Sequence, residues 1–379
     1  MSSTLRITEI KESHITDDHT AEGFLATNKN GSIIHVFRLD PSGDHIGNNG
    51  YIAKRISEDN GKTWSQPQKV YDSNEYDDRN VHGGITKSGR IVCFFREFDA
   101  ENNRHIGKYT IHSDDGGSSW SEKRKIKGSP ATVYGTGQMF YNDYLQKYCM
   151  TGYTTGYLEI RFSDDGINWD EYVVIDDRRG EKKLSEIAGA YVGDNRIICI
   201  ARNNERSTDN QLMQYVSVDG GENWDFYGNT NIPKDHWGTA PQLFYDKQKS
   251  LMIAMTVDRR SQTGSNSNDE RLYIYSNDAN ESILSSKTWV LQTSFIRPNP
   301  NPHRFYGYPS YTKMSNGNYL ITFSDNYKRE NGKENASLYQ FELFFDSRNH
   351  NNAFIKVGGT WLFVEKKYVK TSDEWKLIT

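Results

Sequence analysis

Short apolar runs separated by polar turns follow one another along almost the whole chain. Residues 23–40, for example, hold the runs GFLAT and SIIHVFRLD on either side of Asn30-Gly31. An Asn-Gly pair between two such runs is a strong signal for a hairpin of two β-strands. No long stretch carries apolar residues at the 3.6-residue spacing of a helix. The pattern therefore predicts an all-β protein.

The same order of elements recurs along the chain: strand, hairpin, strand, variable loop, third strand, turn, fourth strand. The second strands read IIHVFRLD, IVCFFREFD, KYCMTGY, RIICIARNN, LMIAMTVD and YLITFSD. A period of roughly fifty residues is typical of repeat architectures in which each unit is one small sheet. Six such units and the termini would use up all 379 residues. We therefore expect a single domain over residues 1–379 rather than two or three ordinary ones.

One turn motif marks these units. It reads SEDNGKTW, SDDGGSSW, SDDGINW and SVDGGENW, starting at Ser57, Ser113, Ser163 and Ser217, and a degenerate copy starts at Ser276. An Asp side chain can accept hydrogen bonds from turn amides, and a Gly can adopt the positive φ of a tight corner. The Trp can cover the corner with apolar surface. Because the motif recurs almost unchanged, we interpret it as a folding device and not as a catalytic site.

This motif, Ser-x-Asp-x-Gly-x-x-Trp, resembles the Asp box of the sialidase (neuraminidase) superfamily. The resemblance implies a β-propeller, and the period predicts six blades of four-stranded antiparallel sheets. Five blades with a C-terminal appendage are the alternative, because the apolar runs in residues 346–379 either close the last blade or form a small appendage. Asp boxes also occur in propellers without catalysis, so the motif alone does not define a reaction.

Composition excludes several other classes of function. A net charge of −4 offers no basic field for nucleic acid or for an anionic membrane. No run approaches 18 apolar residues, and the N-terminus has no apolar core of a Sec signal peptide. We expect a soluble protein, either cytoplasmic, part of a virion or released by a non-classical route. The three cysteines, Cys93, Cys149 and Cys199, fall at equivalent buried positions, so neither a disulfide, a metal site nor a cofactor is expected.

In a propeller, the start of the first strand and the end of the second strand of each blade face the central axis. The second-strand ends include Arg38, Arg96 and Arg202. With His82, Glu186 and Tyr308 at first-strand starts, they predict a cationic pocket for a carboxylate or sulfate on a sugar, since Arg presents a bidentate fork. The alternative is that each arginine forms a salt bridge between blades.

Several of these residues match sialidase segments. Glu186, followed by a hairpin and Arg202, resembles the segment that carries the glutamate partner of the nucleophile and one arginine of the carboxylate-binding triad. Gly307-Tyr308-Pro309-Ser310 resembles the segment around the nucleophilic tyrosine, which sialidases use in place of the usual carboxylate. Asp44 lies where sialidases place the acid/base aspartate. Arg271 is a weaker match to another triad arginine.

The first blade departs from the sialidase pattern. Sialidases carry an Arg-Ile-Pro motif whose Arg belongs to the triad, and Ala21 stands at that position here. Arg38 or Arg96 could replace it from a nearby position. Otherwise the ligand is not sialic acid, or the site binds without cutting. Trp237 is a further expected contact, either a stacking platform for a sugar ring or part of the core.

The sequence thus predicts a glycan-recognising propeller. We interpret it as a glycoside hydrolase related to exo-sialidases, acting on an anionic or complex sugar, with Tyr308 as nucleophile, Glu186 as its base and Asp44 as acid/base. The alternative is a carbohydrate-binding adhesin without turnover, such as a phage or viral receptor-binding protein. A protein-interaction scaffold is a third and weaker interpretation. The sequence names neither the sugar, the linkage nor the oligomeric state.

Overall fold

A computed structural model describes most of the chain. The described residues are 4–14, 16–128, 134–181, 184–204, 211–233, 238–258, 270–298, 307–328, 334–346, 353–357, 360–364, 367–371 and 374–378. Within them nearly all regular structure is strand, and the one helix is the short α1 (Ala279–Ser282). The all-β prediction is confirmed. The chain divides into two compact units, Arg6–Phe344 and a smaller one formed by Met1–Leu5 with Phe345–Thr379.

Four sheets have four antiparallel strands each, in the chain order that the repeat predicts. The first holds β7 (Asp77–Ile85), β8 (Ile91–Asp99), β9 (Arg104–Ser113) and β10 (Arg124–Lys125). The second holds β11 (Phe140–Asn142), β12 (Lys147–Thr154), β13 (Tyr157–Ser163) and β14 (Glu171–Asp177). The third holds β15 (Leu184–Gly193), β16 (Arg196–Asn203), β17 (Met213–Ser217) and β18 (Asp225–Asn229). The fourth holds β19 (Gly238–Asp246), β20 (Leu251–Asp258), β21 (Arg271–Asp278) and β22 (Val290–Ile296).

The remaining sheet of the large unit has nine strands and is larger than predicted. It joins two antiparallel groups: β3 (His19–Thr27), β4 (Ile33–Asp40), β5 (Tyr51–Ser57) and β6 (Gln68–Tyr71), and β23 (Gly307–Lys313), β24 (Tyr319–Lys328) and β25 (Glu334–Asp346). One parallel pair, between Ala336 and His19, links them. The N-terminal strands β1 (Thr4–Ile7) and β2 (Lys11–His14) pair with β25. The N-terminus therefore supplies the closing strands.

The C-terminal strands do not join that sheet in the described part of the chain. They form two hairpins, β26 (Ala353–Val357) with β27 (Thr360–Val364), and β28 (Lys367–Thr371) with β29 (Glu374–Ile378).

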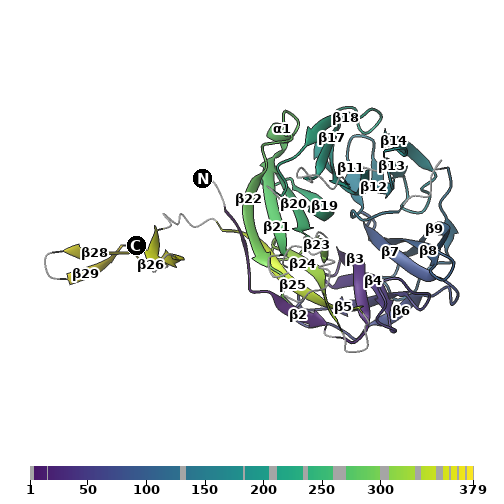
Figure 1. Ribbon diagram of the computed structural model, residues 1–379, viewed down its shortest axis with the longest axis horizontal. Coiled ribbons are helices and arrows are strands. Elements are labelled where there is room, and N and C mark those ends of the chain that lie inside the picture. The colour runs from purple at the N-terminus through teal and green to yellow at the C-terminus, as the bar shows by residue number, and fades with distance from the viewer. Residues whose placement is uncertain are drawn as a thin grey trace. The chain divides into compact units, whose positions relative to one another are not determined.

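The first strands of the sheets surround a common axis in the large unit (Figure 1). Strand β3 contacts β7, β15 contacts both β12 and β19, and β23 contacts both β19 and β3. The amide of Met139, just before β11, donates to the carbonyl of Gly83 in β7 at 2.8 Å and completes the ring. Apolar side chains of neighbouring sheets pack together around this ring, as Ile198 and Ile200 of β16 do with Leu243 of β19.

The Asp boxes form the corners between third and fourth strands. In the first box, the amide of Thr63 donates to Oδ1 of Asp59 at 2.9 Å, and the amide of Gly61 donates to the Ser57 hydroxyl at 2.8 Å. The other three intact boxes repeat both contacts. The boxes pack against turns between first and second strands, as where the Asn28 amide group donates to the Gly116 carbonyl at 3.5 Å. The structural role predicted for the motif is confirmed.

Candidate functional site

A β-bulge interrupts the pairing of most first strands after one to three residue pairs. It places Glu22, Asn80, Glu186, Ala240 and Tyr308 at equivalent positions of β3, β7, β15, β19 and β23. Apart from Glu186 these residues have φ between 45° and 54°, which is uncommon for residues other than glycine. Bulges re-aim side chains and are frequent beside active sites. Glu186 and Tyr308, which the sequence assigns to catalysis, thus share one structural position.

Two of the bulged residues are glutamates that make the same contact. Oε2 of Glu186 accepts a hydrogen bond at 2.8 Å from the amide of Ala240, the bulged residue of the next sheet. Glu22 accepts a hydrogen bond from the amide of Asn80 in the same way. Glu186 differs because Nη1 of Arg202 lies 3.2 Å from the same Oε2 atom. Glu186 and Arg202, which the resemblance to a sialidase segment assigns to the site, are therefore in contact, and Glu186 also bonds to the neighbouring sheet.

The phenol of Tyr153, at the end of β12, lies among charged groups from several sheets. Burial raises the pKa of this phenol well above its ordinary value, and the charges of Glu186 and Tyr308 raise it further. The Arg96 guanidinium acts in the opposite direction, and Glu22 adds a smaller increase. All four therefore lie close enough to this hydroxyl for their charges to act on it. We call Tyr153 and these four residues the axial site.

Arg96 is the cation of the axial site, and few contacts compensate its charge. Its guanidinium lies 3.9 Å from the ring centre of Tyr134, which packs edge-on against Tyr153. Its Nε is buried without a hydrogen bond, and no ion pair joins it to another described residue. Burial and the Arg79 charge lower its pKa. Arg79 is its cross-strand neighbour, and its ion pairs with described residues are two long ones of 3.5 Å, to Glu22 and Asp77.

Arg38 lies in a different environment. It is 1% exposed, and its Nε lies 2.7 Å from Asp77 while its Nη2 lies 3.1 Å from Asp40. Its Nη1 donates to the main-chain carbonyl of Asp44 at 3.1 Å. A ligand carboxylate would have to displace these partners. The salt-bridge alternative considered for each arginine describes Arg38 well.

Asp44 lies on the loop between β4 and β5 that Arg38 fixes. The carboxylate of Asp44 is half-buried and makes no hydrogen bond to another described residue. Asp77 anchors the same loop by accepting from the amide of Gly47 at 3.2 Å. The loop thus presents a carboxylate from a backbone held in place, which a proton donor requires.

The other predicted residues lie elsewhere. His82 is 1% exposed and stacks on Phe94, and burial lowers its pKa to about 3, so its ring is neutral and enclosed. Arg271 is half-buried at the start of β21. Trp237 lies outside the described residues. No group of His, Cys, Asp or Glu among the described residues could hold a metal ion. No described helix is long and apolar enough to span a membrane.

Sequence reasoning missed Arg79 and Tyr134 as parts of the site, whereas Tyr153 stands among the second-strand ends that the repeat places toward the axis. The alignment of repeats placed His82 at the position that Asn80 occupies, because a bulge shifts the register of β7. The signal was present in the run Asp77-Asp78-Arg79-Asn80, whose charges have no place on an ordinary buried strand.

Comparison with known families agrees with this geometry. A ring of four-stranded sheets with Asp boxes defines a sialidase-like β-propeller. The sequence matches the BNR repeat-like domain over residues 3–321, and the chain belongs to this family. The superfamily resemblance drawn from the Asp boxes is thereby confirmed. Among curated proteins no match to the chain was found.

Solved structures share the fold at low sequence identity. A protein of unknown function from Dyadobacter fermentans has a TM-score of 0.69 at 18% identity, covering 90% of this chain and all of its own. The NanB sialidase of Streptococcus pneumoniae has a TM-score of 0.63 at 13% identity, covering 87% of this chain and 70% of its own. The endosialidase of phage phi92 has a TM-score of 0.65 at 12% identity, covering 98% and 76%. At such identities the likeness establishes the fold alone.

Proposed function

We propose that this protein is a glycoside hydrolase of sialidase type that acts on an anionic or complex sugar at the axial site. The observation that carries the proposal is the convergence of Tyr308, Glu186 and Arg96 on the Tyr153 phenol. These residues come from three sheets, so their meeting depends on the fold and not on sequence proximity. The names of the structural neighbours, sialidases and an endosialidase, support the same substrate class.

In the proposed reaction Tyr308 attacks the anomeric carbon. A phenol with an ordinary pKa of about 10 is a weak nucleophile without a base. Glu186 takes the phenolic proton while the bond to the leaving oxygen breaks, and Asp44 donates a proton to that oxygen. Water then cleaves the glycosyl-tyrosine bond, with Asp44 accepting a proton from the water and Glu186 returning one to the tyrosine.

Arg96 and Arg202 are the proposed contacts for an anionic group on the sugar, with Arg79 beside them. Arg96 has an unused buried Nε and no carboxylate partner among the described residues. Arg79 lies next to it on the same face and could take part of the role that the sialidase pattern gives to an arginine at position 21. Arg38 is omitted because carboxylates already occupy it. Arg271 and His82 remain secondary candidates for ligand contact.

A carbohydrate-binding adhesin without turnover is the second candidate. Ala21 pairs across the strands with Arg38, so the position of the missing arginine faces a guanidinium that is already neutralised. That observation favours a site that holds a glycan less tightly at one end.

We also propose that the nine-stranded sheet counts as two blades, giving six in all. The closed ring of first strands supports this count.

The deciding experiment is a screen of the wild-type protein against fluorogenic glycosides, including sialosides, together with a glycan array. Hydrolysis that is lost in Tyr308→Phe supports the enzyme. Glycan binding without hydrolysis of any substrate, weakened by Arg202→Ala, supports the adhesin. A folded protein that neither hydrolyses a glycoside nor binds a glycan would contradict both proposals.

A further inference from the structure

The end of the first strands opposite the axial site also carries features of a binding site. Strand β15, for example, runs from Glu186 at the axial site to Tyr191, about 16 Å further along at 3.3 Å per residue. Around this far end lie two hollows of about 360 and 530 Å³, within the range of small-molecule sites. Both hollows are lined by Tyr141, Tyr191 and Tyr245. We call these three residues the tyrosine arc.

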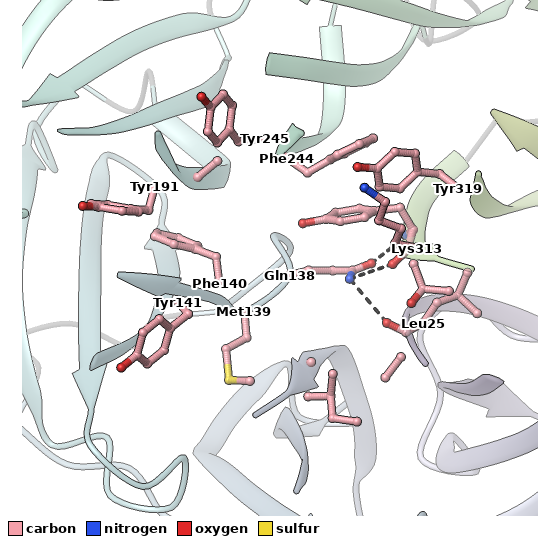
Figure 2. A pocket seen from close by; sticks show the side chains of 16 residues that line it. Leu25, Gln138, Met139, Phe140, Tyr141, Tyr191, Phe244, Tyr245, Lys313 and Tyr319 are labelled. Carbon is pink, nitrogen blue, oxygen red and sulfur yellow. Dashed lines mark hydrogen bonds between the residues drawn. The ribbon is translucent and has the colours of Figure 1, made fainter. Parts of the chain in front are cut away.

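The tyrosine arc comes from three consecutive sheets at matching positions. Each residue lies one or two places before the end of its first strand, in β11, β15 and β19. Figure 2 shows the three rings along one side of the smaller hollow, Lys313 and Tyr319 on the other side, and Gln138 between them. The repeat therefore builds a row of aromatic walls that no single sheet could supply.

The rings and hydroxyl groups of Tyr191 and Tyr245 are available for contact with a ligand. Each ring is half-buried and packs on one side against a hydrophobic core cluster. Neither hydroxyl makes a hydrogen bond, and neither ring stacks on another, among the described residues. A tyrosine in this state offers one apolar face and one polar edge to a ligand.

Each of the three cations that line the hollows lies near a carboxylate. Lys313 lies 3.5 Å from Asp246, Arg196 lies 3.1 Å from Asp194, and Lys247 lies 4.0 Å from Asp143, which also lies 3.1 Å from Lys87.

Among the described residues, the cations that line the hollows thus have carboxylate partners that an acidic ligand would have to displace. The site thus differs in kind from the axial site with its unpaired Arg96.

We propose that the tyrosine arc is a second binding site, specific for a neutral oligosaccharide. Pyranose rings present C–H faces that pack on aromatic rings, and their hydroxyls can bond to tyrosine hydroxyls and to the paired charges at the rim. The successive rings suit successive sugar units. The second site holds the protein on a glycan surface through contacts independent of the axial site, which raises the effective concentration of substrate or receptor there.

The test is calorimetric titration with cellotetraose, maltotetraose, tetra-N-acetylchitotetraose and lacto-N-tetraose. We expect wild type to bind at least one of them, and the double variant Tyr191→Ala/Tyr245→Ala to bind it about tenfold more weakly or not at all. Tyr172→Ala, which removes a half-buried tyrosine on the outer strand β14, is the matched control and leaves binding unchanged. Thermal unfolding of each variant verifies folding.

Arg96→Ala separates this site from the axial one, because it leaves neutral-sugar binding intact while weakening anionic ligands. Failure of all four probes to bind wild type overturns the proposal, as does undiminished binding by the double variant. Sedimentation analysis tests whether a second copy of this chain occupies the arc. If wild type self-associates and the double variant is monomeric, the arc is an interface between copies of this chain and the proposal is wrong.

Discussion

At the scale of single residues, Arg38 and Arg96 occupy equivalent strand ends but have opposite surroundings. We expect Arg38→Ala to lower the free energy of unfolding by about 3–5 kcal/mol, because it leaves Asp77 and Asp40 buried without their cation. Arg96→Ala removes a stacking contact with Tyr134 and a like charge beside Arg79, so stability changes by less than about 1 kcal/mol.

For ligand binding we expect the reverse order of the two variants, with Arg96→Ala more damaging than Arg38→Ala. An anionic glycan should bind Arg96→Ala about tenfold more weakly or worse, measured by calorimetry well below the unfolding temperature. Arg96→Lys serves as the control that keeps the charge and loses the fork. Equal binding by wild type and Arg96→Ala would remove Arg96 from the site.

The catalytic proposal makes its own prediction at this scale. Tyr308→Phe removes only the nucleophilic oxygen, so kcat should fall roughly a thousandfold or more while ligand binding stays near wild type. Glu186→Gln keeps a side-chain oxygen that can accept from the Ala240 amide but removes the base. It should reduce the rate by about 10²–10⁴-fold. Single-turnover rates on a cleaved fluorogenic glycoside, with unfolding temperatures alongside, check both.

Sequence patterns located part of this site and missed the rest for a definite reason. The sequence spacing of Glu186 and Arg202 corresponds to neighbouring positions in the sheet, because the two residues lie on strands joined by a short hairpin that preserves the register. Arg79 was missed because a bulge of β7 adds residues to one strand only, and the sequence period does not reveal such extra residues. Tyr153 and Tyr134 meet through one isolated bridge, which has no sequence signature.

At the scale of elements, the Asp-box corners are acid-sensitive. Hydrogen bonds from the Thr63 hydroxyl, and then its amide, lower the pKa of Asp59 to about 2. A carboxyl whose pKa is lower in the folded than in the unfolded chain stabilises the fold above its unfolded pKa of about 3.9, and this stabilisation is lost as the pH falls toward 2.

We therefore expect Asp59→Asn to flatten the dependence of unfolding temperature on pH between about 4 and 2. Asp164→Asn, an exposed residue in the third box, is the control and should leave that slope as in wild type. A wild-type slope in Asp59→Asn would show that this carboxylate does not hold the corner.

Strand pairing could be predicted well at this scale, because apolar alternation and turn residues are local signals. The pairing of β2 with β25 could not, since it joins residues more than three hundred positions apart. The polar strand β2 (KESH) carries no pattern that distinguishes it from a loop.

At the scale of the whole molecule, this closure should govern stability. Ser13 binds the buried Arg55 through its carbonyl at 2.6 Å and its hydroxyl at 2.9 Å, and β2 covers one edge of β25. Deleting residues 1–14 removes both and exposes a strand edge. We expect the unfolding temperature to fall by several degrees and light scattering to increase, whereas Ser13→Ala should have a much smaller effect. A truncated chain as stable and monodisperse as the full one would contradict this role of β2.

The side chain of Gln138 crosses the middle of the ring. Its carboxamide donates to the carbonyls of Tyr311 and Leu25 and accepts from the amide of Tyr311, and Gln242 bonds to its backbone. These bonds tie together strands from three sheets, and Figure 2 shows the Gln138 side chain reaching toward Leu25. The crossing stands in the path of a saccharide that would pass along the axis. In the proposed reaction a cleaved sugar would then leave by the mouth through which the substrate arrived, so released product should act as a competitive inhibitor.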